Sequence, residues 1–343
     1  MEHEFIAITL KGAEKFLSKE MNQYGIRCKN GEQYCEFSTT KKRLLEFAYF
    51  SQTAERICIK LYEAERDNEE NFGIPNEIAR REFKPVIIGD DEKGSIRKLL
   101  EEKCNVRYSS KESIIFIVEK ERVIIAEDIL NYELSKRDYR VFVTPRTLNP
   151  IVATCLALMS NPCKTQTILD PFCNDGTIAI ETAFLLLHRS INYYTKNIFK
   201  VPFFDFDVER FLKELDKKEV KEELKIIVSD LNSSSITYTK KNAKIAGIHK
   251  KIESFFNIKE VEERLQKERI DIALSFPKKS SKSIYVYNMI KKHLSENGFL
   301  CFALDDNFLL PEEFNCEEKK EIMQGKKKIT LARFSLNNSL QGL

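Results

Sequence analysis

The sequence lacks the marks of zinc-stabilised, disulfide-rich, secreted and membrane-spanning proteins. Its nine cysteines include no C-x-x-C pair and its four histidines are far apart, so we predict neither a metal site nor a disulfide scaffold. No apolar run is long enough to cross a membrane. The N-terminus, MEHEFIAITL, carries acids where a secretory signal would carry bases. These absences predict a cytoplasmic protein with no membrane partner.

An excess of one sign of charge is also missing. The chain has 56 lysines and arginines against 53 acidic residues, which gives a formal net charge of +3. That balance permits nucleic-acid binding without requiring it. A length of 343 residues exceeds the usual size of one domain, so we expect two or three domains.

The stretch ILDPFCNDGTIAIE, residues 168–181, predicts a buried strand, a loop of small residues and a helix. In this layout the loop backbone approaches a ligand, and the helix N-terminus adds free N–H groups. Gly176 supplies a position without a Cβ, and Asn174 suits a positive φ. Asp170, at the strand end, is placed to meet a cationic amine. An ordinary strand-to-helix turn remains the alternative.

Two nucleotide-binding signatures are absent from this loop. It has neither the Lys-Ser/Thr ending of a P-loop nor the G-x-G-x-x-G of an NAD-type oxidoreductase. Residues 226–229 form another predicted strand, with Asp230 at its tip. An acid there either holds ribose hydroxyls or simply caps the following helix. We therefore expect an amino-acid-bearing nucleoside as the ligand rather than a nucleoside triphosphate.

The order of predicted elements divides the chain into modules. Residues 4–62 follow a βαββαβ order, which is typical of a ferredoxin-like α+β unit. The pattern restarts at Glu82, after the charged stretch 63–71. From residue 151 strands alternate with helices and end in an antiparallel hairpin. That alternation predicts an α/β fold with a doubly wound, Rossmann-like sheet.

The N-terminal half resembles known RNA-binding modules. ELSKRDYRV, residues 133–141, is similar to the closing segment of a THUMP domain, and residues 53–56, TAER, match a run in the ferredoxin-like domain that accompanies it. The resemblance implies that residues up to about Tyr139 bind RNA through a basic run. That run ends in Lys136, Arg137 and Arg140. The predicted modules are a ferredoxin-like domain at 1–66, a THUMP domain at 67–141, a linker at 142–155 and a Rossmann-like domain at 156–343.

DPFCNDGT, residues 170–177, resembles the cofactor loop of THUMP-linked RNA (guanine-N2) methyltransferases, which usually reads D-P-F-C-G-S-G-T. KKNAKIAG, residues 240–247, resembles the helix after their ribose-binding acid. The resemblance implies a class I methyltransferase domain with a seven-stranded sheet and S-adenosylmethionine as cofactor. Asp170 would meet the methionine amino group, Asp230 the ribose, and Asn257 would lie near the adenine. The implied cofactor-binding residues are Asp170, Pro171, Phe172, Cys173, Asn174, Gly176, Thr177, Asp230, Leu231 and Asn257.

One motif departs from that family. The family's fourth strand ends in Asn-Pro-Pro-Tyr, whose Asn and a backbone carbonyl accept hydrogen bonds from a base amine while the Tyr stacks on the base. Residues 275–278 here read Ser-Phe-Pro-Lys, so the candidate catalytic residues are Ser275, Phe276 and Pro277. Ser275 can still accept one hydrogen bond, but Lys278 cannot stack as an aromatic ring does. Phe276, Tyr285 and Tyr287 are the alternative platforms.

Two functions remain open at this point. The first is S-adenosylmethionine-dependent methylation of guanine N2 in tRNA or another structured RNA. The second is a non-catalytic paralogue that binds RNA as a structural or regulatory module. If the protein is an enzyme, the altered strand end predicts that it is slow, or that a protein partner supplies the missing group.

Overall fold

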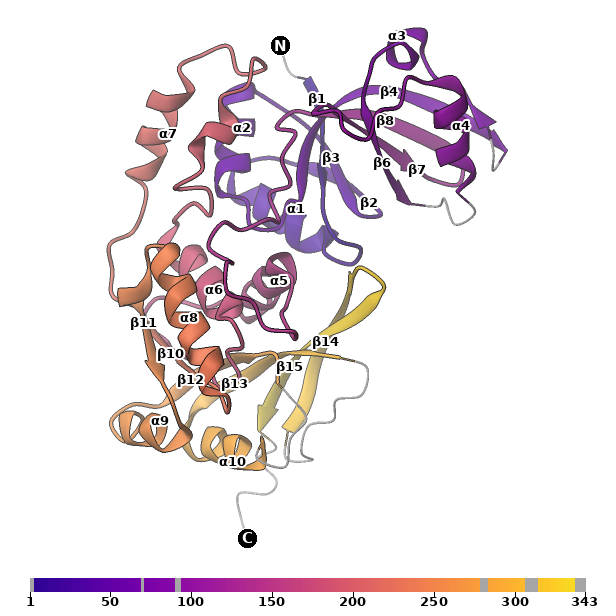
Figure 1. Ribbon diagram of the computed structural model, residues 1–343. Coiled ribbons are helices and arrows are strands. Elements are labelled where there is room, and N and C mark those ends of the chain that lie inside the picture. Colours follow the sequence, from indigo (N-terminus) through magenta and orange to yellow (C-terminus); the bar gives the residue numbers. More distant parts are fainter. Residues whose placement is uncertain (1–2, 69–70, 90–93, 278–282, 306–313, 337–343) are drawn as a thin grey trace. The chain divides into compact units, whose positions relative to one another are not determined.

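The computed structural model describes residues 3–68, 71–89, 94–277, 283–305 and 314–336. The chain forms two compact units, whose elements are labelled in Figure 1. Unit 1 combines Met1–Tyr49, Ala54–Leu134 and Lys196–Leu212, and unit 2 combines Phe50–Thr53, Ser135–Thr195 and Lys213–Leu343. Each unit is therefore built from segments that are distant in sequence.

The first half of unit 1 has the predicted βαββαβ order. Its elements are β1 (His3–Ile8), α1 (Glu14–Gln23), β2 (Cys28–Gly31), β3 (Tyr34–Thr39), α2 (Lys41–Phe50) and β4 (Arg56–Asn68). β1 pairs antiparallel with both β3 and β4. Phe5, Ile6 and Ala7 in β1 are fully buried, so this strand lies at the centre of the ferredoxin-like module.

The second half of unit 1 continues the same sheet. Its elements are β5 (Asn71–Phe72), α3 (Asn76–Ala79), β6 (Lys84–Gly89), α4 (Ser95–Lys103), β7 (Ser113–Val118) and β8 (Arg122–Asp128). The strand order is β2-β3-β1-β4-β8-β7-β6, with β5 also paired to β4. Most of the charged stretch that we expected to separate two domains lies inside β4, which pairs with β8 as far as Glu65. A boundary at residue 66 stays a prediction, but the sheet is continuous across Glu63–Glu65.

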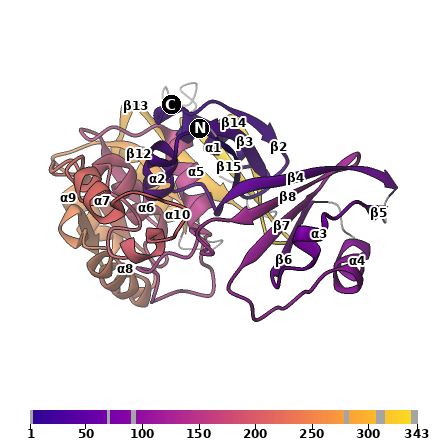
Figure 2. The ribbon, with the colours of Figure 1, turned by 90° about the horizontal axis from the view of Figure 1, so that it is seen from above.

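Helices α3 and α4 lie beside β6 and β7 (Figure 2). Ile78 from α3 and Ile96 and Leu100 from α4 are buried in one apolar cluster with Phe116 of β7. The spacing of Ile96 and Leu100 by four residues places both side chains on one face of α4. The opposite face carries Arg97 and Lys98, which are exposed.

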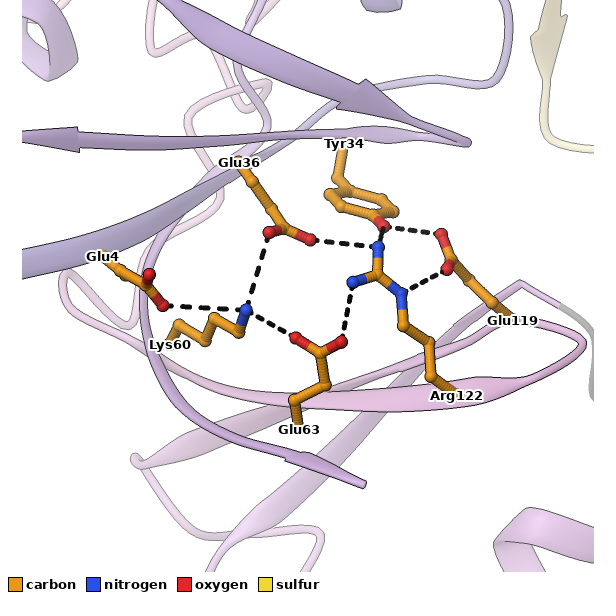
Figure 3. Close-up of polar contacts among 7 residues, drawn as sticks. All are labelled: Glu4, Tyr34, Glu36, Lys60, Glu63, Glu119 and Arg122. Carbon is orange, nitrogen blue, oxygen red and sulfur yellow. Dashed lines mark hydrogen bonds and ion pairs between the residues drawn. The ribbon is translucent and has the colours of Figure 1, made fainter. Parts of the chain in front are cut away.

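Charged side chains connect the two halves of the unit 1 sheet. Figure 3 shows this carboxylate cluster, which consists of Glu4, Tyr34, Glu36, Lys60, Glu63, Glu119 and Arg122. The Arg122 guanidinium binds Glu119 at 2.7 Å and Glu63 at 2.8 Å, and Lys60 Nζ lies 2.6 Å from Glu63. The cluster holds four carboxylates against two cations, so it disfavours the approach of a phosphate backbone.

The segment Lys196–Leu212 returns to unit 1 from within the α/β part of the chain. It contains the 3₁₀ helix η1 (Lys196–Phe199) and the first turn of α7 (Val208–Asp216). The Phe203 ring packs edge-on against Phe5, with a centroid separation of 6.0 Å, and Lys41 Nζ lies 3.0 Å from Asp205. This segment of the second half of the sequence is therefore part of the N-terminal core.

Unit 2 contains the predicted seven-stranded sheet. Its elements are α5 (Pro150–Ser160), β9 (Thr167–Asp170), α6 (Thr177–Leu187), β10 (Lys225–Ser229), α8 (Ser233–Ile245), η2 (His249–Lys251), β11 (Ile252–Phe255), α9 (Ile258–Arg264), β12 (Ile270–Ser275), α10 (Ser283–His293), β13 (Leu294–Leu304), β14 (Phe314–Gln324) and β15 (Lys327–Leu336). The strand order is β11-β10-β9-β12-β13-β15-β14. The order reverses between β9 and β12, which is the switch point where doubly wound sheets bind ligands.

Helices cover both faces of this sheet. Figure 1 shows α5 and α6 along one face and α9 and α10 along the other. Val261 of α9 and Val286 and Ile290 of α10 belong to one buried cluster with sheet residues such as Leu169 and Leu300. α5 and α6 are apolar on almost every side, because they pack against each other as well as against strands.

Arg137 has a different role from the one that we predicted. Its side chain is 1% exposed and forms an ion pair with Glu181 of α6, at 2.9 Å between Nε and Oε1. The same carboxylate accepts hydrogen bonds from Tyr139, Gln52 and Thr154, at 2.7 to 2.9 Å. Arg137 is therefore a structural residue of unit 2, and the expectation that it contacts RNA is wrong.

Within the residues that the structure describes, no helix is both long enough and apolar enough to span a membrane. All nine cysteines are free thiols, five of them buried: Cys35, Cys58, Cys155, Cys173 and Cys301.

Candidate functional site

The loop after β9 has the backbone conformation that its sequence predicts. Asn174 has a φ of 52° and Gly176 a φ of 84°, both in the left-handed region that Asn and Gly adopt most easily. The N–H of Cys173 donates to the carbonyl of Ser229 at 3.0 Å, which ties the loop to β10. α6 then begins at Thr177.

The glycine in this loop has a packing role that we did not foresee. A Cβ on Gly176 would lie 2.7 Å from Thr239 Cγ2 in α8, so any side chain there would force the loop away from that helix. The side chains of Phe172 and Cys173 are also buried in the protein, and Pro171 and Thr177 are buried with them. These residues shape the loop through packing, so their contribution to ligand binding through the backbone stays a prediction.

Asp170 is the buried acid at the end of β9. The side chain is 1% exposed, and its Oδ1 accepts hydrogen bonds from Ser275 Oγ at 2.6 Å and from the Phe172 N–H at 3.3 Å. Nothing among the described residues donates to its Oδ2. The pKa of Asp170 is raised to about 7, mainly by burial and to a smaller extent by the nearby Asp230 and Asp175 carboxylates. A buried carboxylate with one free oxygen is suited to a cationic partner.

Asp230 follows β10 and faces the same loop. Its Oδ2 accepts from the Asn174 N–H at 3.1 Å and its Oδ1 from the Asn232 N–H at 2.8 Å. Asn232, rather than Asp230, caps α8 through its side chain, so the acid is not the plain helix cap that remained an alternative. A carboxylate oxygen can accept more than one hydrogen bond, so the chemistry of Asp230 is compatible with ribose hydroxyls.

Two exposed apolar side chains follow the neighbouring strands β10 and β11. Leu231 is 42% exposed and Phe256 is 48% exposed. Ser229 and Phe255 are register partners in these parallel strands, so both side chains lie at the carboxyl edge of the sheet. Sequence reasoning missed Phe256, although an aromatic residue directly after a strand and before Asn257 was the available signal. Asn257 itself caps α9, since its Oδ1 accepts from the Glu260 N–H at 3.0 Å, and its place near an adenine stays a prediction.

The end of β12 carries the altered motif. Ser275 is fully buried and uses its hydroxyl proton on Asp170, while the carbonyl of Phe276 accepts a hydrogen bond from Asn174 Nδ2 at 3.4 Å. Pro277 is buried, and Lys278 lies outside the described residues. The Phe276 ring is 2% exposed and lies under the Arg146 guanidinium, 4.3 Å from the ring centroid.

The three aromatic alternatives for a base platform differ in exposure. Phe276 and Tyr287 are both buried, and Tyr287 packs 6.1 Å from Phe172 in the core. Tyr285, in the first turn of α10, is 68% exposed. A buried ring cannot stack on an incoming base without movement of its neighbours, so Tyr285 is the accessible member of the three.

Comparison with known proteins identifies the region around this site. Residues 137–277 match the family model described as an RMKL-like methyltransferase domain, and residues 4–58 match the RlmL ferredoxin-like domain. The region is a methyltransferase domain. Two curated relatives align with most of the chain. A tRNA (guanine(6)-N2)-methyltransferase of Methanocaldococcus jannaschii is 27% identical over 71% of this chain and 72% of its own length. The candidate RNA methyltransferase YpsC of Bacillus subtilis is 26% identical over 72% of each.

Solved structures share the fold over 98% of the chain. SMU.472, a candidate methyltransferase solved with bound SAH, aligns with a TM-score of 0.74 at 17% identity, over 98% of both chains. TrmN from Thermus thermophilus aligns with a TM-score of 0.65 at 14% identity, over 98% of this chain and all of that one. The methyltransferase fold implies S-adenosylmethionine as the methyl donor.

The residues of the methyltransferase domain fit that cofactor. Its methionine part carries an amine and its adenosine part carries ribose hydroxyls and an aromatic base. Asp170 offers an unpartnered buried carboxylate oxygen for the amine, and Asp230 lies at the tip of the adjacent strand. The exposed Leu231 and Phe256 side chains suit the faces of a flat ring.

The segment before α5 holds the loop from the other side. Thr147 Oγ1 donates to Asp175 Oδ2, and Arg140 donates to the same threonine at 2.7 Å. Asn242, in the KKNAKIAG stretch, donates to the carbonyls of both Asp175 and Phe142, at 2.9 and 2.7 Å. Asp175, which stands where similar loops usually have a small residue, thus connects the start of α6 to this segment through its side chain.

Proposed function

We propose that the protein is an RNA methyltransferase that acts on guanine N2 in tRNA. The observation that supports the proposal most directly is that Asn174 contacts two candidate site groups at once. Its backbone N–H donates to Asp230, and its side-chain Nδ2 donates to the carbonyl of Phe276. The cofactor acid and the strand-end acceptor are thereby held side by side. The Methanocaldococcus relative, named for methylation of guanine N2 in tRNA, supports this choice of substrate.

The roles of the residues follow from their chemistry. S-adenosylmethionine, when bound, supplies a methyl group on a positively charged sulfur. Asp170 would hold its amine, Asp230 its ribose, and Leu231 and Phe256 its adenine. The strand end from Ser275 to Pro277 would position the base amine with hydrogen bonds, because methyl transfer requires orientation more than acid–base help.

We also propose that the second half of unit 1 is a THUMP domain that binds the RNA. The support is the resemblance of residues 133–141, of which Glu133 and Leu134 belong to unit 1 and the rest to unit 2, together with the RNA methyltransferase relatives. The carboxylate cluster disfavours phosphate on its own surface. On the exposed side of α4 the cations Arg97, Lys98 and Lys103 outnumber the acids Glu101 and Glu102, which favours it. We therefore place the RNA backbone along α4.

The test of the enzymatic function is methyl transfer from labelled S-adenosylmethionine to bulk tRNA, followed by mass spectrometry of the nucleosides. We expect N2-methylguanosine to appear. The non-catalytic alternative keeps one observation in its favour, since the Ser275 hydroxyl is occupied by Asp170. If the protein binds both cofactor and tRNA but transfers no methyl group to any base, the non-catalytic function is the correct one.

Replacement of Asp230 by alanine is expected to weaken SAH binding roughly 10- to 100-fold, because a hydrogen bond to a charged group contributes about 1.5–3 kcal/mol. Asp271→Ala is the matched control. That acid binds the Thr167 N–H at 2.9 Å at the opposite, amino edge of the same sheet. Titration calorimetry should show an affinity loss for Asp230→Ala and none for Asp271→Ala. Equal SAH affinity in wild type and Asp230→Ala would contradict the assignment of Asp230 to the ribose.

Reversal of two charges on α4 is expected to weaken tRNA binding. Arg97→Glu/Lys98→Glu removes two phosphate contacts, and the slope of log affinity against log salt should fall by about 0.9 for each. The control is Lys217→Glu/Lys218→Glu, which makes the same change of charge in unit 2. Gel shifts at several salt concentrations measure both variants. An equal loss of tRNA affinity in the two variants would mean that the overall charge of the protein, and not the α4 surface, determines binding.

A further inference from the structure

Asn174 stands where the similar cofactor loops have glycine, and its side chain has a defined orientation. Its Nδ2 lies 2.8 Å from the carbonyl oxygen of Phe172 and 3.4 Å from that of Phe276. Carbonyl oxygens accept hydrogen bonds and never donate them. The amide nitrogen must therefore face these two oxygens, which removes the usual uncertainty about which end of an asparagine amide is oxygen.

The other end of this amide is an unused acceptor. Asn174 is 4% exposed, and its Oδ1 has no hydrogen-bond donor among the described residues. Buried side-chain acceptors are almost always satisfied in folded proteins, so an unsatisfied one calls for an explanation. Asp170 Oδ2, on the preceding strand end, is unsatisfied in the same way. One free acceptor suits the cofactor amine, and the second is left for a different donor.

The position of the amide indicates which donor that is. Through Nδ2 it contacts the carbonyl of Phe276, the strand-end group that the proposed reaction uses as an acceptor. That reaction needs a side-chain acceptor beside this carbonyl, and Ser275 does not supply an amide there. Asn174 brings a side-chain amide to the same carbonyl from the neighbouring loop, with its nitrogen toward that carbonyl and its oxygen unpartnered among the described residues. The group that is missing from β12 is thus present, but it comes from the loop after β9.

We propose that Asn174 is a catalytic residue whose Oδ1, together with the carbonyl of Phe276, accepts the two N–H bonds of the exocyclic amine of the target base. This inference rests on the proposed function. With both N–H bonds held, the nitrogen lone pair forms the new bond to the methyl carbon. The carbon–sulfur bond breaks, its electron pair stays on sulfur as a neutral thioether, and the nitrogen releases one proton to water.

The test compares Asn174→Gly with the compensated variant Asn174→Gly/Ser275→Asn. Glycine keeps the positive φ of the loop and removes only the amide. We expect Asn174→Gly to bind SAH with unchanged affinity and to methylate tRNA about 10²–10³-fold more slowly, the usual effect of losing one preorganised hydrogen bond. Ser275→Asn in that background should restore most of the rate, because it returns an amide to the strand end.

Asn161→Gly is the matched control. Asn161 also has a positive φ, of 48°, but it is exposed at the end of α5, so we expect its replacement to leave the rate unchanged. A wild-type rate in Asn174→Gly would overturn the inference and leave the proposed function intact. A loss of SAH affinity as large as the loss of rate would also overturn it, since Oδ1 would then serve the cofactor. If the wild-type protein transfers no methyl group while it binds SAH and tRNA, the proposed function fails and the inference fails with it.

Discussion

Replacement of Glu181 by glutamine is expected to lower the free energy of unfolding by about 3–5 kcal/mol, the usual result of removing one partner from a buried ion pair. The variant has nearly the same shape but leaves Arg137 charged in a site where its side chain is 1% exposed. Glu181 also accepts from three other side chains, so no nearby group can replace it. Urea unfolding followed by circular dichroism measures the change.

Two further variants test the reason for this loss. Glu214→Gln breaks an ion pair with Lys217 in which both side chains are more than half exposed, and such pairs contribute at most about 1 kcal/mol. Glu181→Leu/Arg137→Met removes both buried charges and should regain part of the lost stability, because apolar replacement of a buried pair is often neutral. The rest should stay lost, because the Tyr139, Gln52 and Thr154 side chains then have no acceptor. If Glu181→Gln were no less stable than Glu214→Gln, the buried Arg137–Glu181 pair would contribute no more to stability than an exposed pair does.

The affinity for S-adenosylmethionine is expected to rise about tenfold for each pH unit between pH 5 and 7. Binding of the cofactor amine favours the ionised form of Asp170, whose pKa is raised to about 7 in the free protein. Below that value Asp170 must release one proton when the amine binds, so each pH unit lowers the binding free energy by about 1.4 kcal/mol. Above about pH 8 the affinity should fall again, because an α-amino group then loses its charge.

The same titration has a defined effect on folding. An aspartate has a pKa of about 3.9 in the unfolded chain, below its value in the folded protein. The folded state therefore binds more protons between these two values, and the stability of the free protein falls as the pH rises through this window. Cofactor binding offsets that loss, so the rise in melting temperature on adding SAH should be larger at pH 8 than at pH 5.

Asp170→Asn is the control for this pH dependence. It keeps an acceptor for Ser275, which donates to Oδ1, but it has no charge to titrate. Its affinity should be low and independent of pH between 5 and 7. Calorimetry in two buffers of different ionisation enthalpy should also detect proton release in wild type and none in the variant. A wild-type affinity that does not change below pH 7 would contradict the assignment of Asp170 to the amine.

Local patterns predicted the elements that build the site. The strands β9, β10 and β12 were visible as short apolar runs, each followed by a polar or small residue. The positive φ of Asn174 followed from the residue type in a tight turn. The order of modules followed from the switch between alternating and helical periodicity. These features depend on neighbours in sequence, which is why a single chain reveals them.

Features that depend on distant partners were not predictable in this way. Arg137 was interpreted as a surface cation because its partner, Glu181, is 44 residues further along the chain. The charged run in β4 was interpreted as a domain boundary because its pairing with β8 involves residues about 60 positions later. Asn174 read as a backbone residue, because nothing in the sequence places its amide beside the carbonyl of Phe276. In each case the chemistry of the residue was visible and its surroundings were not.

The return of Lys196–Leu212 to unit 1 has a consequence for the order in which the protein is made. A ribosome that has synthesised only the first 141 residues has not yet produced Phe203, which packs against Phe5. The N-terminal core therefore stays incomplete until more than half of the chain has emerged, although domains usually fold as units during synthesis. Deletion of this late segment should leave the aromatic surface around Phe5 without its cover, and the early half of the protein would then be prone to aggregate.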